Sequence, residues 1–296
     1  MEKHAEILAP AGGEAQLRAA VLCGADAVYL GLRGFNARAG AENFDENTLP
    51  QTVGWCHARG VRVYVTLNTL VTDRELPQWL HSLDAVAAAG VDGVLVQDLG
   101  LYALMKRCAP QLTVHASTQM SLHTPAGAAL AQELGMSRVV LSREMSLAEM
   151  RAVADACDVE LEAFVHGALC MSVSGQCYFS AVLGSRSGNR GQCAQPCRLP
   201  FAAPGGTGHD LSLKDFSFIP RVDELRRAGI CSAKIEGRLK RPEYVAAATQ
   251  ACRRAADGEA IPPELLRDLE AVFSRSGFTA GYPDGKLGRL SLIHIS

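Results

Sequence analysis

The sequence lacks the features that mark membrane, secreted and strongly basic nucleic-acid-binding proteins. Its 296 residues contain no uninterrupted apolar stretch of the ~20 residues that a membrane-spanning helix needs. The first ten residues, MEKHAEILAP, are charged and turn directly into a strand-like run, unlike a secretory signal. The formal net charge is −2, so any contact with RNA has to come from local patches. We therefore expect a cytoplasmic protein, and its candidate basic patches are Arg186, Arg190 and Arg198, and Arg238, Lys240 and Arg241.

Motifs of two common hydrolase classes are absent as well. No H-E-x-x-H string is present, which excludes the standard zinc-binding helix of metalloproteases. No G-x-S-x-G nucleophile turn occurs, because GSRSG at 184–188 has the wrong order. His166 and Cys170 could form a Cys–His pair, but a cysteine that binds a metal or cluster cannot also serve as a nucleophile. The residues alone therefore give peptide hydrolysis little support.

Cysteine, by contrast, is concentrated in one segment rich in glycine and serine. Cys170, Cys177, Cys193 and Cys197 lie within 28 residues of chain, and the other six cysteines are scattered like small buried hydrophobes. Disulfides are rare in cytosolic proteins, so such a group favours a metal or an iron–sulfur cluster. Structural zinc sites usually show two close cysteine pairs, and only Cys193-AQP-Cys197 is such a pair. The spacing favours a cluster, with zinc as the alternative.

Apolar strand-like runs alternate with amphipathic helical patterns along most of the chain. The helical patterns show apolar spacings of three and four and occupy 14–24, 46–60, 75–90, 99–108, 126–135 and 147–157. The strand-like runs are 5–10, 27–32, 61–68, 93–98, 113–118, 138–142, 159–167 and 232–237. Eight buried strands in strict alternation with helices predict an α/β fold, a (β/α)8 TIM-like barrel. A doubly wound open sheet is the alternative, since periodicity cannot show closure.

Polar residues end most of these strands, and in a barrel the strand ends converge at one mouth, where active sites form. The residues in question are Asn68, Gln97, Asp98, Ser117, Thr118, Gln119, Ser142, Arg143, Glu144, His166 and Glu236. The cysteine-rich segment, 166–198, follows the seventh strand. We therefore expect it to fold over that mouth as an insertion between strands 7 and 8.

The sequence predicts two regions. A barrel over 5–258 contains the cysteine-rich segment, an exposed turn at 201–210, and a short strand and helix within 211–230. A C-terminal extension over 259–296 holds a short helix and a glycine-punctuated tail that stops without a capping element. We expect this extension to be the start of a further region, or its last residues to be non-native.

Several long strings resemble the collagenase-like peptidase family U32. LEAFVHGALCMSVSGQC at 161–177 and NRGQCAQPCR at 189–198 are similar to the family's two cysteine-bearing signatures. SLKD at 212–215, KIEGRLKRPEYV at 234–245 and the opening LAPAGGEAQLRAAVLCGADAVYLGL also match. The resemblance covers nearly all of 5–285.

The resemblance implies two different activities. The family was named for peptidase or collagenase activity, yet several members are iron–sulfur proteins that take part in hydroxylation of transfer RNA, ribosomal RNA or ubiquinone precursors. For the RNA members it implies prephenate as the source of the hydroxyl group. It places a 4Fe–4S cluster on Cys170, Cys177, Cys193 and Cys197, with Cys231 in reserve. The ribosomal-RNA branch is the nearest match, and a peptidase of unassigned mechanism is the alternative.

These considerations give a set of candidate site residues. Arg198, Lys234 and Arg238 could bind a dicarboxylate such as prephenate, because guanidinium pairs bidentately with carboxylate. Asn189 and Arg190 could shape the cysteine-rich segment around the substrate. Glu162, His166 and Glu236 are the candidate catalytic groups for proton transfer. The alternatives are a surface ion pair of Lys234 or Arg238 with Glu236 or Asp215, and a packed strand-end role for His166.

Overall fold

A closed barrel of eight parallel strands forms the centre of the molecule. The computed structural model describes residues 5–173, 176–201, 204–206, 208–275 and 277–292. Strands β1 to β7 pair in chain order, and β9 pairs in parallel with both β1 and β7, which closes the ring. The barrel strands are β1 (Glu6–Ala11), β2 (Ala27–Gly31), β3 (Arg62–Leu67), β4 (Gly93–Val96), β5 (Val114–Ala116), β6 (Arg138–Val140), β7 (Glu160–Gly167) and β9 (Ser232–Ile235). The predicted (β/α)8 barrel is confirmed, and the open sheet is wrong.

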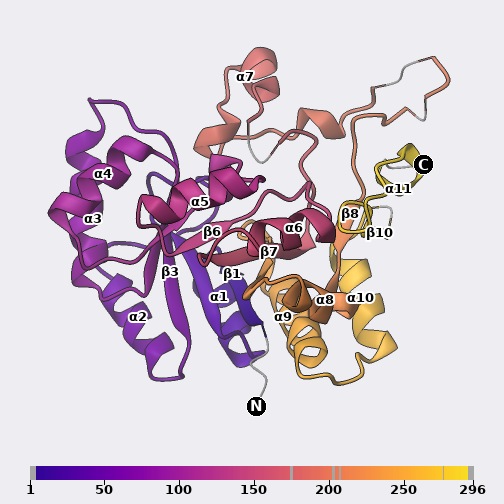
Figure 1. Cartoon of the computed structure of the whole chain (residues 1–296), viewed down its shortest axis with the longest axis horizontal. Helices are drawn as coiled ribbons and strands as arrows, with labels where there is room; N and C mark the ends of the chain where they lie inside the picture. The colour runs from indigo at the N-terminus through magenta and orange to yellow at the C-terminus, as the bar shows by residue number, and fades with distance from the viewer. Residues whose placement is uncertain (1–4, 174–175, 202–203, 207, 276, 293–296) are drawn as a thin grey trace.

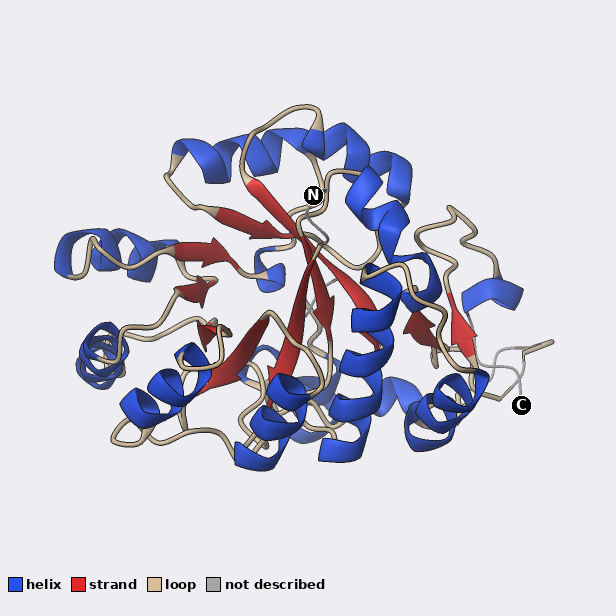
Figure 2. Cartoon of the chain, turned by 90° about the horizontal axis from the view of Figure 1, so that it is seen from below, coloured by secondary structure: helices blue, strands red, loops and turns tan. Residues whose placement is uncertain are grey.

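Helices surround the ring on its outer side (Figures 1 and 2). Local signals place several of their starts: Asp98 caps α4, Ser146 and Glu149 form a capping box on α6, and Pro242 begins α9. The helices of the outer layer are α1 (Glu14–Leu22), α2 (Leu49–His57), α3 (Leu76–Ala88), α4 (Leu99–Cys108), α5 (Pro125–Glu133), α6 (Leu147–Ala154), α8 (Val222–Arg227), α9 (Pro242–Ala256) and α10 (Pro263–Phe273).

Two short strands lie outside the ring. β8 (Asp215–Ser217) pairs antiparallel with the end of β7, and β10 (Phe278–Thr279) pairs in parallel with β8. The strand and helix predicted within 211–230 are therefore present as β8 and α8. Parts of the predicted turn at 201–210, and the tail after Leu292, lie outside the described residues.

The cysteine-rich segment stands apart from the packed layers. It contains the short helix α7 (Phe179–Gly184) and two single turns of 3₁₀ helix, Gly188–Arg190 and Pro196–Arg198. Figure 1 shows α7 projecting from the top of the molecule, well away from the outer helices. Within the described residues, no helix is long and apolar enough to cross a membrane.

Candidate functional site

A small cavity of about 50 Å³ opens where the barrel strands end, and we call it the mouth cavity. Its neutral polar lining comes from the ends of β3 and β5: Thr66, Asn68, Ser117, Thr118 and Gln119. The expected convergence of strand-end residues is thus confirmed for Asn68, Ser117, Thr118, Gln119, Arg143 and Glu236. Asp98 has another task, since its carboxylate caps α4 by accepting from the backbone N–H groups of Gly100 and Leu101.

The charged lining of the mouth cavity is unbalanced. Four cations (Arg38, Arg143, Lys234 and Arg238) surround one carboxylate, Glu236. Arg38 Nη2 donates to Glu236 Oε1 at 2.8 Å. Burial by itself raises the pKa of Glu236, but the nearby arginines, with Lys240, outweigh burial and hold that pKa below its usual range. Glu236 is therefore ionised, and the cavity still keeps an excess of positive charge.

Arg238 is a buried cation of the mouth cavity whose hydrogen-bond partners are neutral. Its side chain is 5% exposed, and Nη1 donates to Thr66 Oγ1 at 2.8 Å and to Asn36 Oδ1 at 3.2 Å. Within the described chain, no carboxylate lies within ion-pair distance of its guanidinium. Burial lowers the pKa of Arg238 to about 10. The alternative of a surface ion pair is wrong for this residue, because burial keeps it from solvent and its partners are neutral.

Lys234 lies at the bottom of the mouth cavity, and Glu162 lies beneath it. Lys234 Nζ is 2.7 Å from Glu162 Oε1, and both side chains are almost fully buried. The ammonium group also stands 4.2 Å from the centre of the Tyr29 ring. Of the two candidate catalytic carboxylates, only Glu236 is at the mouth, because Glu162 is three residues into β7 and Glu236 follows the end of β9.

Below Lys234, a matched set of charges fills the other half of the barrel, and we call it the floor network. It joins Glu6, Glu160 and Glu162 to Arg62, Arg138 and Lys234. Arg138 Nη1 is 2.7 Å from Glu6 and 3.2 Å from Glu162. Burial by itself lowers the pKa of Arg138, but these two carboxylates raise it further than burial lowers it.

His166 does not reach the mouth cavity. A bulge between Phe164 and His166 shifts the pairing of β7 with β9, so Phe164 faces the cavity while the His166 ring points outward. That ring packs among Tyr244, Phe273 and Phe278, with centroid distances of 5.0–5.7 Å. Burial lowers the pKa of His166 to about 3. The expectation of a mouth-facing His166 is wrong, and the packed strand-end alternative describes its position.

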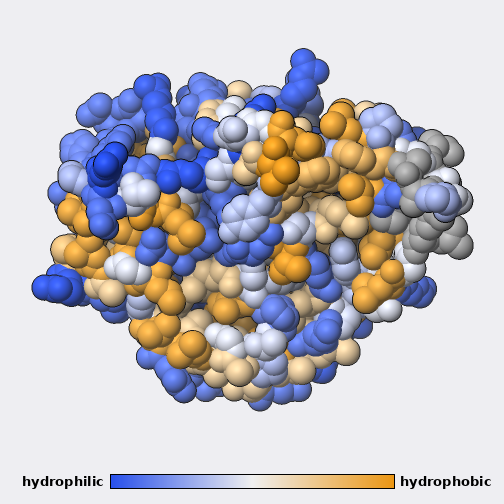
Figure 3. Space-filling view, turned by 90° about the horizontal axis from the view of Figure 1, so that it is seen from above, coloured by the Kyte–Doolittle hydropathy of each residue, from blue (hydrophilic) through white to orange (hydrophobic). Residues whose placement is uncertain are grey.

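The cysteine-rich segment lies against the mouth, as expected. Gln176 Nε2 donates to the backbone carbonyl of Gln119 at 2.9 Å. Gly191 has φ +78°, and a Cβ there would come within 2.5 Å of the Ala39 backbone nitrogen. Only glycine fits this close approach to the loop that carries Arg38. Figure 3 looks onto the face from which α7 projects, where hydrophobic and hydrophilic side chains alternate.

The remaining predicted binding residues hold this segment in place and do not line the mouth cavity. Arg198 donates to the backbone carbonyls of Leu169 and Leu213. Arg190 forms an ion pair with Glu75, next to the start of α3. Asn189 lies in the same 3₁₀ turn as Arg190, and its Oδ1 is buried without a hydrogen-bond partner among the described residues. The structure therefore supports a shaping role for Asn189 and Arg190 and gives Arg198 the same role.

The four cysteines are free thiols in one region of this segment. Burial is the largest cause that raises the pKa of the Cys197 thiol. The nearby thiols of Cys170, Cys177 and Cys193 raise this pKa further. Backbone N–H groups point at two of the sulfurs: Phe179 N lies 3.4 Å from Cys177 Sγ, and Gln195 N lies 3.3 Å from Cys193 Sγ. Four thiols with N–H donors fit a thiolate-bound cluster in chemistry. Among the described residues, however, no three metal-binding side chains already stand in a coordinating arrangement.

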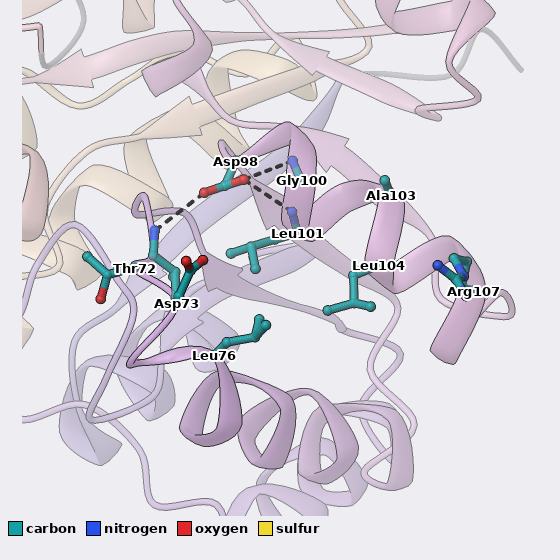
Figure 4. Close-up of a pocket in the computed structure, with 10 residues that line it drawn as sticks. Thr72, Asp73, Leu76, Asp98, Gly100, Leu101, Ala103, Leu104 and Arg107 are labelled. Carbon is teal, nitrogen blue, oxygen red and sulfur yellow. Dashed lines mark hydrogen bonds between the residues drawn. The ribbon is translucent and has the colours of Figure 1, made fainter.

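A larger cavity, of about 320 Å³, lies to the side between α3 and α4 (Figure 4). Its lining includes Leu76, Leu101 and Leu104, with Asp98 at one end and Arg107 at the other. Asp98 is already bound by backbone N–H groups, including that of Val71 at 3.4 Å. This cavity offers less chemistry than the smaller one at the mouth.

Sequence reasoning missed one of the cations, Arg38, and placed Arg143 at the mouth without a binding role. Arg38 comes from the long loop between β2 and α2, and Arg143 follows β6 and stands 4.0 Å from the centre of the Phe164 ring. Long loops at the carboxyl ends of barrel strands are where functional residues gather. The length of the 32–48 loop was therefore the available signal for Arg38.

Comparison with known proteins places the chain among relatives that share most of its length. The model of peptidase family U32 matches residues 12–291. The chain is 40% identical to the 23S rRNA 5-hydroxycytidine C2501 synthase of Escherichia coli over 85% of this chain. It is 34% identical to tRNA hydroxylation protein P1 of Bacillus subtilis and 33% identical to a collagenase of Porphyromonas gingivalis, over 94% of this chain in each case.

The chain does not span these relatives fully. The match covers 39% of the Escherichia coli protein, 71% of the Bacillus subtilis protein and 73% of the Porphyromonas gingivalis protein. Among solved structures, the U32 peptidase Mk0906 matches with a TM-score of 0.47 and 20% identity, over 56% of this chain and 71% of that one.

Proposed function

Because this chain belongs to peptidase family U32, whose matching relatives include RNA hydroxylation proteins, we propose that it takes part in hydroxylation of ribosomal or transfer RNA in the cytoplasm. The observation that carries the proposal is the charge excess of the mouth cavity, four cations around one carboxylate. Such a cavity suits a small anion with more than one carboxylate, because guanidinium groups bind carboxylates bidentately. Prephenate is the co-substrate of this class that we propose.

Each cavity residue has a proposed part in this reaction. Arg238 and Arg38 bind carboxylates, and Lys234 stands at the bottom next to the rest of the bound anion. Glu236 is the ionised group that accepts or returns a proton at the mouth. Glu162 positions Lys234 from below. No proton-transfer role is proposed for His166, because its ring lies outside the barrel.

The cysteine-rich segment is the proposed cofactor site. Cys170, Cys177, Cys193 and Cys197 would hold a 4Fe–4S cluster, with structural zinc as the alternative. When bound, such a cluster supplies electron transfer. Cys231 is not favoured as a ligand, because its Sγ donates to the Leu161 carbonyl at 3.2 Å, within the barrel wall.

Peptidase activity is supported by the name of a relative but by little in the geometry of the candidate site. One relative is a collagenase, which keeps peptide hydrolysis as the second candidate. The single Cys–His pair that the sequence offered is not available as a nucleophile and base, because the His166 ring packs among aromatic side chains. Metal content separates the two candidates, since a peptidase has no need of a cluster.

The test combines cofactor analysis with RNA analysis. The protein and its Cys193→Ala variant are purified without oxygen, and iron, acid-labile sulfide and absorbance near ~400 nm are measured. Both are also expressed in Escherichia coli lacking its own RNA hydroxylation proteins, and hydroxylated nucleosides in 23S rRNA and tRNA are quantified by mass spectrometry. Cys108→Ala, an exposed cysteine outside the segment, is the matched control.

We expect iron and sulfide in the wild type and in Cys108→Ala, together with one restored RNA modification, and loss of both in Cys193→Ala. The RNA that regains its hydroxyl group identifies the branch. A colourless protein that contains zinc and cleaves peptides, with no RNA modification restored, would overturn the proposal and favour the peptidase.

A further inference from the structure

Lys234 is a buried amine whose nitrogen faces a cavity. Its side chain is 4% exposed, yet it lines the mouth cavity from the bottom. The nitrogen stands 4.2 Å from the centre of the Tyr29 ring and 5.7 Å from that of Phe164. A lysine needed only for charge is more easily placed at the solvent-exposed rim. A desolvated lysine inside a pocket is the type that forms covalent bonds with carbonyl substrates.

A proton acceptor for this amine is already in place. Glu162 is fully buried, and its Oε1 lies 2.7 Å from Lys234 Nζ. Its other oxygen, Oε2, is held by Arg138 at 3.2 Å, so the carboxylate has a fixed orientation. Burial lowers the pKa of Lys234, and the positive charges of Arg238 and Arg138 lower it further, against the opposing effect of Glu162. Proton transfer from the ammonium to Glu162 would leave the lone pair needed for attack.

A carboxylate anchor stands near the same aromatic ring as the amine. The Arg238 guanidinium lies 5.6 Å from the centre of the Tyr29 ring, the same ring that Lys234 approaches. Among the described residues, Arg238 bonds only to neutral oxygens, so it has capacity for an anion. A molecule with a carbonyl next to a carboxylate would bring these two groups to Lys234 and Arg238 together.

We infer that Lys234 condenses with the carbonyl group of a 2-oxo acid whose carboxylate is bound by Arg238. Lys234 Nζ, after losing a proton to Glu162, forms a bond to the carbonyl carbon while the C=O π electrons move to oxygen, which takes up a proton. Loss of that oxygen as water then gives a C=N bond, so amine and carbonyl become imine and water. No oxidant or reductant is consumed. The inference rests on the proposed function, because it names the chemical class of the small anion: prephenate carries a 2-oxo acid group.

The imine can be trapped without any RNA. The wild-type protein is incubated with pyruvate, the smallest ketonic 2-oxo acid, and reduced with borohydride, and the adduct is located by peptide mass mapping. We expect the adduct on Lys234 in preference to exposed lysines such as Lys106, because burial lowers the pKa of Lys234 and so leaves more of its amine unprotonated. Pyruvate methyl ester, which lacks the charge for Arg238, should give no such preference.

Two variants complete the test. Lys234→Arg keeps the positive charge and should lose the adduct, and Lys240→Arg removes a lysine outside the cavity lining and should keep it. An adduct spread evenly over exposed lysines, or absent from the Lys234 peptide of wild-type protein, would overturn the inference. RNA hydroxylation, measured separately, distinguishes the two proposals: restored hydroxylation without an adduct refutes only the imine, and an adduct without hydroxylation refutes only the proposed function.

Discussion

The two ends of the barrel interior carry similar charged residues in opposite arrangements. In the floor network, Glu6, Glu160 and Glu162 face Arg62, Arg138 and Lys234, three acids against three bases. At the mouth, three further cations, Arg38, Arg143 and Arg238, face Glu236 alone. Glu6, Glu162, Arg138 and Lys234 of the floor are buried, and Glu160 and Arg62 are about half exposed. Lys234 belongs to both, since its nitrogen bonds Glu162 below and lines the cavity above.

The difference separates charges that hold the fold from charges that await a ligand. A buried charge is tolerated when it is paired, and an unpaired one is costly. The floor satisfies its charges within the chain and lies at the amino-terminal ends of the strands, the end of such barrels associated with stability. The mouth leaves positive charge uncompensated where active sites form, which is the expected state of a site for an anion.

The strongest test of the difference between floor and mouth is to remove Arg138, the residue at the centre of the floor network. Arg138→Ala would remove a buried cation that Glu6 and Glu162 share. We expect a loss of about 3–5 kcal/mol in the free energy of unfolding, the usual cost of leaving a buried charge uncompensated. Urea unfolding followed by circular dichroism measures it.

The matched control for this prediction is Arg62→Ala. Arg62 also pairs with Glu6, but its side chain is half exposed and Glu6 keeps Arg138. We expect a loss of no more than about 1 kcal/mol, as for exposed ion pairs. Equal effects of the two substitutions would show that the floor is not a single stabilising network.

Removing a cation from the mouth should weaken ligand binding without lowering the free energy of unfolding. Arg238→Gln deletes a buried charge that has no carboxylate partner among the described residues, so we expect unfolding free energy to stay the same or rise. Affinity for prephenate should fall by roughly 10- to 100-fold, because a hydrogen bond to a charged group contributes about 1.5–3 kcal/mol. Isothermal titration calorimetry measures this affinity.

Lys240→Gln is the control at the mouth, since Lys240 lies near Glu236 without lining the cavity. Its effect on affinity should be small. Loss of ligand binding together with the cluster spectrum in Arg238→Gln would contradict the prediction, because Arg238 would then support the structure of the whole mouth.

The sequence predicted the barrel well because burial and periodicity are local properties. Each parallel strand reads as an apolar run, and each helix shows its own spacing and caps. Side-chain direction at strand ends is less local. Phe164 and His166 are two residues apart and should share a face, yet the bulge between them turns His166 outward. No sequence pattern in VHG at 165–167 predicts that bulge.

The partners of buried charges are equally hidden from the sequence. Arg138 and Glu6 are separated by 132 positions, and only barrel closure brings them together. Of the three cations predicted to bind the substrate, Lys234 and Arg238 line the cavity and Arg198 does not, while Arg38 enters the site from a loop with no motif. Cysteine spacing indicated the segment at the mouth, while its contacts through Gln176 and Gly191 required the folded chain.

His166 offers a test of another kind, because it is a titratable group outside both charged regions. Its pKa is lowered to about 3 by burial, below the value near 6.5 of an unfolded chain. Between these values the unfolded chain binds a proton that the folded protein does not, so stability falls as the pH drops from about 6.5 towards 3. His166→Phe keeps the aromatic packing with Tyr244 and Phe273 and removes this titration. The difference in unfolding free energy between wild type and variant should change by up to about 1.4 kcal/mol per pH unit in that window. His115, also buried with a pKa of about 3, is present in both proteins, so its contribution cancels.

A difference in unfolding free energy that stays constant with pH would contradict this prediction. It would mean that His166 gains a proton in the folded protein as it does in the unfolded chain, and would return it to the candidates for chemistry at the mouth.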